Sequence, residues 1–168
     1  PVPRTRLLLQ KLKVSLTLSI FALLLLPIFA WLVGYIAFGS APLQTPLGAT
    51  LTNSEALIRI MIISLYIGFN LLFVSGLSFY LSVRTDVPLG AVGIAVGISI
   101  LFNILDAISA LGDLRKWLPT HYAYSWLDAL AGEIEWSTMI RGASFTAMCG
   151  IVFYALAFTK FARKDITS

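Results

Sequence analysis

The sequence predicts an all-α fold, a polytopic bundle of membrane-spanning helices. The chain is 58% hydrophobic and only 12% charged, whereas soluble domains carry about 25% charged residues. It also contains four long stretches without a charged residue. A soluble domain of 168 residues cannot bury so much apolar surface. We therefore expect lipid to be the solvent for much of the chain.

The uncharged stretches define four expected spans, because a spanning helix needs roughly 17–25 apolar residues. Within a single domain over 1–168, the spans are placed at 14–39, 58–83, 87–110 and 140–162. Pro27 lies inside the first span and is expected to kink or open that helix. The segment between the first two spans is rich in Pro, Gly and Thr, which predicts an irregular loop.

Local signals place the helix ends and the packing faces. Asn53 or Ser54 is expected to cap the second helix, with Glu55 in its first turn. Asp86 is expected to cap the third, with Pro88 in the first turn. Small residues four apart predict close helix packing; they are Gly93 with Gly97, Ala91 with Ala95, and the series Gly142, Thr146 and Gly150.

Basic residues predict the orientation in the membrane. Eight of the twelve Lys and Arg lie before the first span, in the turn at Arg84 or from residue 160 onward, at and beyond the end of the fourth span. Six of the eight acidic residues lie on the other side. By the positive-inside rule both termini are cytoplasmic, and the net charge of +4 describes topology rather than an affinity for nucleic acid.

Residues 112–136 contain the only histidine and three of the four tryptophans. From Thr120 to Gly132 the pattern predicts an amphipathic helix of roughly 20 Å, too short to cross a bilayer core of ~30 Å. We expect a half-membrane or interfacial helical hairpin on the outer side. Its candidate functional residues are Trp117, Pro119, His121, Tyr122, Trp126 and Asp128.

A basic "PVPRTRLLLQKL" before a span, four spans, "LRKWLPTHYAYSWLDAL" between the last two and a terminal "FARKDI" occur in that order. In this order of features the chain resembles the permease subunit of a type-2 ABC transporter. That family has six helices and an outer re-entrant hairpin between the fifth and sixth. The resemblance covers the last two thirds of such a subunit, so two further helices are expected to precede residue 1.

The resemblance also implies partners and localisation. Residues 1–13 would be the end of a cytoplasmic segment that docks the ATPase, and the docking candidates are Pro3, Arg4, Arg6 and Lys11. Two copies of an ABC ATPase subunit would bind ATP and Mg, and this chain would hold no cofactor or metal. A second permease copy or related permease would complete the path in the cell membrane (plasma or inner), as a multi-pass protein among lipid.

Signatures of enzymes are missing from the sequence. It has no P-loop, and one histidine with one cysteine is too few for an ordinary zinc site. The chain is therefore not expected to be an enzyme by itself, although an intramembrane hydrolase is a weaker alternative. Cys149 lies inside the fourth span, where it is expected to be a packing residue.

Polar residues within and beside the spans are candidates for a path or gate. They are Asn70, Asn103, Asp106 and Arg141. We expect Asp106 to pair with Arg141 or Arg59 and to hold an outer gate closed; the alternatives are an interfacial ion pair or a cap for the hairpin. The sequence thus predicts an ATP-driven permease subunit, and the alternative is a non-transporting assembly or anchoring subunit that binds a partner outside.

Overall fold

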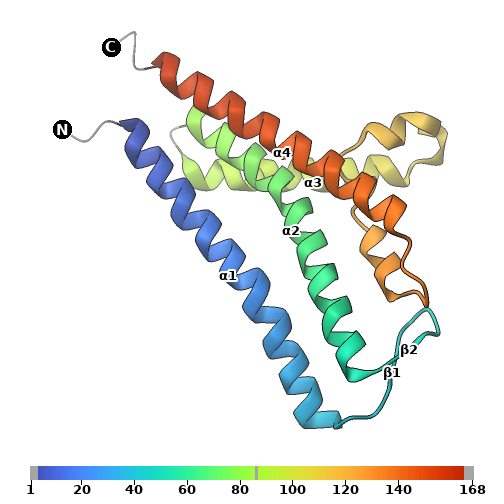
Figure 1. Ribbon diagram of the computed structural model, residues 1–168. Helices are drawn as coiled ribbons and strands as arrows, with labels where there is room; N and C mark the ends of the chain where they lie inside the picture. Colours follow the sequence, from blue (N-terminus) through green and yellow to red (C-terminus); the bar gives the residue numbers. More distant parts are fainter. Residues whose placement is uncertain (1–3, 86, 165–168) are drawn as a thin grey trace. The chain divides into compact units, whose positions relative to one another are not determined.

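The protein is almost entirely helical in a computed structural model that describes residues 4–85 and 87–164 (Figure 1). Its long helices are α1 (Arg4–Phe38), α2 (Asn53–Arg84), α3 (Pro88–Ala107) and α4 (Trp136–Lys164). All four are long and apolar enough to cross a membrane, over Leu12–Phe38, Asn53–Arg84, Leu89–Ala107 and Trp136–Phe161. The predicted fold class is therefore confirmed, as is the expectation of four helices that are able to span a membrane.

The chain divides into two compact units, which are described separately. The first contains residues up to Leu65 together with Leu127–Glu135, and the second contains Tyr66–Trp126 together with the chain from Trp136 onward. Helix α2 passes continuously from the first unit into the second.

In the first unit, α1 begins at Arg4 and continues through Pro27 to Phe38. Residues 4–13, which precede the expected first span, are thus the beginning of the same helix. The indole Nε1 of Trp31 donates a hydrogen bond to the backbone oxygen of Asn53, 3.1 Å away. This bond fastens α1 to the start of α2.

A small β-hairpin joins α1 to α2, where an irregular loop was expected. Strand β1 (Leu43–Gln44) pairs with β2 (Thr50–Leu51) in antiparallel register, with Leu43 opposite Leu51. The buried Thr45 hydroxyl accepts a hydrogen bond from the backbone N–H of Ala49. Gly48 supplies the positive φ of +81° that the turn requires.

Helix α2 is capped by Thr52, and not by Asn53 or Ser54 as predicted. The Glu55 carboxylate accepts hydrogen bonds from the backbone N–H and the hydroxyl of Thr52, at 2.9 and 2.8 Å. The backbone N–H of Glu55 donates in return to the Thr52 hydroxyl. This reciprocal arrangement is a capping box, so the cap lies one residue earlier than expected.

Helix α3 begins at Pro88, in the first turn as predicted, and its N-cap Val87 makes no side-chain capping bond. The predicted cap, Asp86, lies outside the described residues. The core of the second unit contains Phe73, Leu77 and Ala95, with Cys149 and Phe153 packed against them. Cys149 is therefore a packing residue, as expected.

Small residues bring α2 and α4 close together. A Cβ added to Gly76 would lie 2.6 Å from the Gly150 oxygen, and one added to Gly150 would lie 2.6 Å from the Leu72 oxygen. The packing face predicted from Gly150 is thus confirmed. No other part of the described chain packs against Gly93 or Gly97, because an added Cβ at either position meets no atom within 4 Å.

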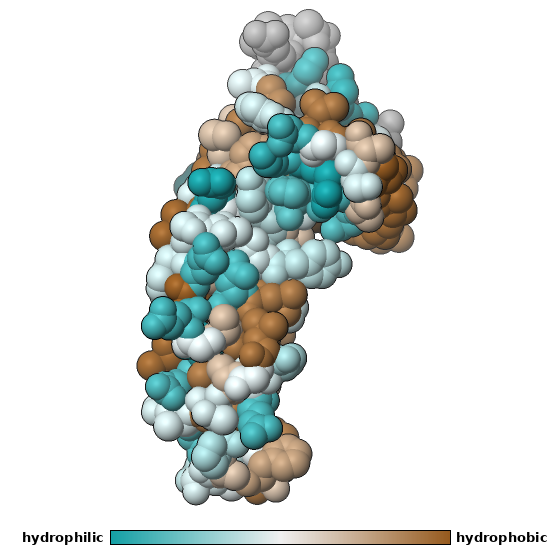
Figure 2. Space-filling view, turned by 90° about the vertical axis from the view of Figure 1, so that its right-hand side faces the viewer, coloured by the Kyte–Doolittle hydropathy of each residue, from teal (hydrophilic) through white to brown (hydrophobic). Residues whose placement is uncertain are grey.

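Ala91 and Ala95, on the other small-residue face of α3, are fully buried. Elsewhere the helices expose large apolar side chains, such as Phe21 at 60%, Leu89 at 82% and Ile151 at 64%. Figure 2 shows apolar side chains reaching the surface beside hydrophilic ones on the face drawn. Lipid is the solvent that suits such a surface.

Candidate functional site

The segment between α3 and α4, residues 108–135, is here called the connecting segment. It contains two short 3-10 helices, η1 (Ser109–Trp117) and η2 (Ser125–Leu130). The helix predicted from Thr120 to Gly132 was wrong in type and in extent, because residues 119–124 form turns. Successive i→i−3 hydrogen bonds join His121 to Leu118, Ala123 to Thr120 and Ser125 to Tyr122.

Hydrogen-bond donors on α2 account for this departure from the α-helix. The Tyr66 hydroxyl, on α2 in the second unit, donates a hydrogen bond to the backbone oxygen of Tyr122. Within the first unit, the Arg59 guanidinium donates to the backbone oxygens of Ala129, Ala131 and Gly132 at 2.7, 2.9 and 3.0 Å. Because these side chains satisfy the carbonyl groups, the segment can do without i→i−4 bonds.

Gly112 lets the segment turn away from α3. Its φ of +50° and ψ of −128° break η1 internally, and an L-residue with a side chain rarely adopts this conformation.

Asp106, in the last turn of α3, binds two side chains of the connecting segment. Its Oδ1 lies 2.6 Å from Nδ1 of His121 and 3.4 Å from Nε of Arg115. The side chains of Asp106 and His121 are only 20% and 24% exposed. A partly buried carboxylate needs such partners, and the cluster holds the connecting segment against the end of α3.

These partners differ from the predicted ones, which were Arg141 and Arg59. Arg59 instead donates to the three carbonyl groups of the first unit, and Arg141 is an exposed residue near the start of α4. Arg115 and His121 lie only nine and fifteen residues after Asp106. They were missed because the prediction sought the partner of Asp106 on other spans, at Arg59 or Arg141. The available signal was that the only histidine lies so soon after the only acid in α3.

Tyr122 ties the connecting segment to α2 and α4. Besides its bond from Tyr66, it lies against Gly142, where an added Cβ would be 2.5 Å from the Cβ of Tyr122 and 2.5 Å from the Tyr66 hydroxyl. Gly142 therefore leaves the space that both tyrosines fill. The role of Tyr66 was not predicted, because a tyrosine inside an apolar stretch resembles an ordinary packing residue.

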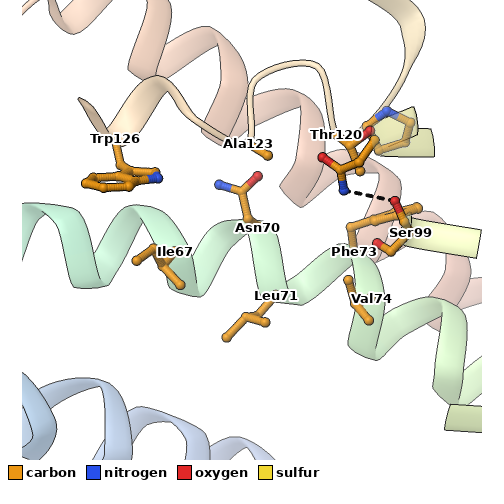
Figure 3. A pocket seen from close by; sticks show the side chains of 11 residues that line it. Ile67, Asn70, Leu71, Phe73, Val74, Ser99, Thr120, Ala123 and Trp126 are labelled. Carbon is orange, nitrogen blue, oxygen red and sulfur yellow. Dashed lines mark hydrogen bonds between the residues drawn. The ribbon is translucent and has the colours of Figure 1, made fainter. Parts of the chain in front are cut away.

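Asn70 and Asn103, predicted as path candidates, meet at one cavity in the second unit. It lies between α2, α3 and residues 119–126, and its lining includes Pro119, Thr120 and Trp126 (Figure 3). Each amide donates one N–H within its own helix, Asn70 to the Tyr66 oxygen and Asn103 to the Ser99 oxygen.

Trp117 and Asp128 are the remaining predicted residues of the connecting segment. Trp117 is 74% exposed. Burial, with repulsion from Glu135 second, raises the pKa of Asp128. In the second unit, a hydrogen bond from Lys116 holds the pKa of the exposed Asp113 below its usual value.

The predicted docking residues fall at the beginning of α1. Arg4, Arg6 and Lys11 are in its first turns, and Arg6 is exposed. Pro3 lies outside the described residues. Among the described residues, no group of three or more His, Cys, Asp or Glu is placed to hold a metal ion.

No family model matches the chain, and no match is found among curated proteins or solved structures.

Proposed function

We propose that this chain is the membrane-spanning subunit of an ATP-driven transporter of the type-2 ABC permease class. A separate ABC ATPase, present in two copies, would hydrolyse ATP with Mg. A second copy of this chain or a related permease would complete the path. The subunit would lie in the cell membrane with both ends in the cytoplasm, as the basic residues predict.

The observation that carries this proposal is the attachment of the connecting segment to three long helices of the second unit. Asp106 holds it to α3, Tyr66 of α2 bonds to its Tyr122, and Gly142 of α4 accommodates that same tyrosine. If the three helices move relative to one another, these contacts cannot all persist, and the segment then changes position. It is therefore suited to close the outer end of a path beside these helices.

The first test is the presence of the ATPase. The chain, purified under mild conditions from its native membrane, should bring down a protein with a P-loop. Reversing Arg4 and Arg6 to Glu together should weaken that association and leave membrane insertion intact. The double change is needed because exposed charge pairs contribute only ~0–1 kcal/mol each.

A matched control reverses Arg163 and Lys164 at the other end of the chain, which should retain the ATPase. Absence of any P-loop protein from the purified complex would contradict the proposal. Retention of the ATPase by the Arg4 and Arg6 variant would contradict the docking role alone.

The proposed orientation has its own test. In a Cys149→Ser background, a cysteine at position 47 should react with an impermeant reagent from outside, and one at position 84 should not. Reaction of position 84 from outside would overturn the orientation.

A second candidate function is anchoring of a partner on the outer face. It is favoured by exposed apolar side chains on the connecting segment, where Leu114 is 68%, Trp117 74% and Tyr124 66% exposed. An anchoring subunit should retain a partner outside the membrane without any P-loop ATPase. The purification described above therefore separates the two functions.

A further inference from the structure

The cavity between α2, α3 and residues 119–126 has a chemistry that the proposed function does not use. Its volume is about 180 Å³. In Figure 3 the amide of Asn70 rises from α2, while Ala123 and Trp126 approach from the connecting segment. The cavity lies wholly within the second unit.

A hydroxyl group at this cavity is without a partner. Thr120 is only 6% exposed, and its Oγ1 is buried with no hydrogen-bond partner among the described residues. Buried polar side-chain atoms almost always have a partner in native structures. Thr120 also contributes to the wall of the cavity, so a bound group that displaces its side chain slightly could supply the missing partner.

Two side-chain amides add further hydrogen-bonding capacity. Asn70 and Asn103 each donate one N–H to a carbonyl oxygen four residues earlier. An amide has two N–H donors and an oxygen that accepts up to two bonds. Each of these residues therefore retains a donor and an acceptor for a ligand.

The rest of the lining is apolar apart from Ser99, and none of it is charged. Aromatic walls come from Phe73 and Trp126, aliphatic walls come from Ile67, Leu71 and Val74, and no charged residue lines the cavity. An ionised ligand would lose its hydration without gaining a counter-charge, which is costly. The lining thus favours a neutral ligand that has both apolar surface and hydrogen-bonding groups.

Size limits the ligand further. A cavity of about 150 Å³ lined by apolar side chains holds benzene. A volume of about 180 Å³ therefore suits one compact ring with a short polar substituent. We propose that this cavity binds an uncharged molecule, or the uncharged end of a larger one, that combines such a ring or a similarly compact apolar body with at least one hydroxyl or amide group.

This inference does not depend on the proposed function, because a chain without transport activity would still bind the ligand. The test uses the whole chain in lipid nanodiscs, labelled with 5-fluorotryptophan and observed by fluorine NMR. Only Trp126 of the four tryptophans lines the cavity, so Trp31, Trp117 and Trp136 report non-specific partition into lipid. The Trp126→Phe variant assigns the resonance.

Benzyl alcohol is the probe, with toluene as the same ring without a hydroxyl and benzylamine as a charged analogue. Benzyl alcohol should shift the Trp126 resonance saturably and leave the other three without a saturable change. Toluene should bind more weakly, by roughly three- to tenfold for one hydrogen bond. Benzylamine, which is cationic at neutral pH, should cause no saturable shift.

Thr120→Val tests the hydroxyl group itself. It should weaken benzyl alcohol binding by a similar factor and leave the unfolding temperature unchanged or higher, because no existing bond is lost. The matched control is Thr146→Val, which removes a buried hydroxyl bonded to the Gly142 oxygen at 2.9 Å. That variant should lower the unfolding temperature and leave the affinity for benzyl alcohol unchanged.

Adding a diacylglycerol to the nanodisc distinguishes the source of the ligand. Displacement of benzyl alcohol would support a neutral lipid headgroup, and persistence of the Trp126 shift would support a free solute. The proposal is overturned if the Trp126 shift never saturates, if toluene and benzylamine reproduce it, or if Thr120→Val leaves the affinity unchanged. The first of these results would indicate a cavity filled by water alone.

Discussion

Nδ1 of His121 lies 2.6 Å from Oδ1 of Asp106, which joins the turn of the connecting segment to the last turn of α3. Arg115 reaches the same oxygen from η1 at 3.4 Å. One carboxylate therefore holds two points of a segment that has little regular structure of its own.

Replacing Asp106 with Asn should loosen the connecting segment. Hydrogen bonds to a charged group contribute about 1.5–3 kcal/mol, and partial exposure of Asp106 places the expected loss of unfolding free energy near the lower end. Thermal unfolding in nanodiscs measures the loss. Under the proposed transport function, the same variant should also raise basal ATP hydrolysis or leak without preventing assembly.

Asp113→Asn is the matched control for that change. It breaks the exposed pair with Lys116 and should lower the unfolding temperature at neutral pH much less than Asp106→Asn does, because exposed ion pairs contribute little. Exchange of charges in the double variant Asp106→Arg with Arg115→Asp should restore part of the lost stability. Equal stability of the parent and Asp106→Asn would mean that the cluster does not hold the segment.

The close approach of α2 and α4 provides a second prediction. Gly150→Ala would place a Cβ 2.6 Å from the backbone oxygen of Leu72, and neither backbone can yield without moving a helix. Overpacking of this kind costs about 1–3 kcal/mol. Thermal unfolding should show this loss for Gly150→Ala and also for Gly76→Ala.

Gly93→Ala and Gly97→Ala serve as controls on α3. An added Cβ meets nothing within 4 Å at either position, and alanine favours the helix by about 1 kcal/mol over glycine. These variants should be as stable as the parent or more stable. A loss equal to that of Gly150→Ala would indicate that an unseen partner covers this face of α3.

These glycines show which features of the fold can be predicted from the sequence and which cannot. Long uncharged stretches identify spans, because length and hydropathy alone decide whether a helix can cross a bilayer. Spacing alone could not tell which small-residue face is packed: Gly93 and Gly97 have the same period as Gly142 and Gly150. What distinguishes them is that Gly150 meets the backbone of α2 and Gly142 meets the side chains of Tyr66 and Tyr122.

The candidate site was less predictable for a related reason. The aromatic and polar content of the connecting segment drew attention to His121 and Tyr122, and the place of Asp106 near the end of a span drew attention to that acid. The structure does place all three in contacts of the segment. The partners Tyr66 and Arg115 were missed because a tertiary hydrogen bond leaves no periodic trace in the sequence. The same bonds replace the predicted helix after Thr120 by 3-10 turns.

Arg59 yields a third prediction within the first unit. Its guanidinium donates to three backbone oxygens at the end of η2, and methionine at this position would leave them without these donors. Each hydrogen bond from a charged group contributes about 1.5–3 kcal/mol, and less where the bond is exposed to solvent. The unfolding free energy of Arg59→Met should therefore be lower than that of the parent by several kcal/mol at most. Arg59→Lys should recover only part, because an ammonium group lacks the planar fork of donors.

Arg84→Met is the control for loss of an arginine. Its guanidinium carbon lies over the Tyr80 ring, 5.3 Å from the centroid, and an exposed contact of this kind contributes ~0.5–1 kcal/mol. The expected loss is therefore smaller than that of Arg59→Met. Limited proteolysis should also cut Arg59→Met faster near residues 129–132, and an unchanged cutting rate would contradict the role given to Arg59.

The fourth prediction concerns pH, and it assigns opposite signs to two carboxylates of the connecting segment. The pKa of Asp128 is raised by burial and by Glu135, so the folded state binds its proton more readily than the unfolded state. Asp128 therefore supports folding below the usual Asp pKa of ~3.9, and that contribution is lost as pH rises through its higher folded pKa. The pKa of Asp113 is lowered by its bond from Lys116, so its contribution is present above the usual value and is lost as pH falls through the folded pKa.

Thermal unfolding of Asp128→Asn, Asp113→Asn and the parent from pH ~3 to ~6 separates these effects. The unfolding temperature of Asp128→Asn relative to the parent should rise with pH, because the variant escapes the cost of ionisation. The corresponding difference for Asp113→Asn should fall with pH, by a smaller amount because solvent screens that exposed pair. Slopes of the same sign would show that the surroundings of Asp128 do not disfavour its charge.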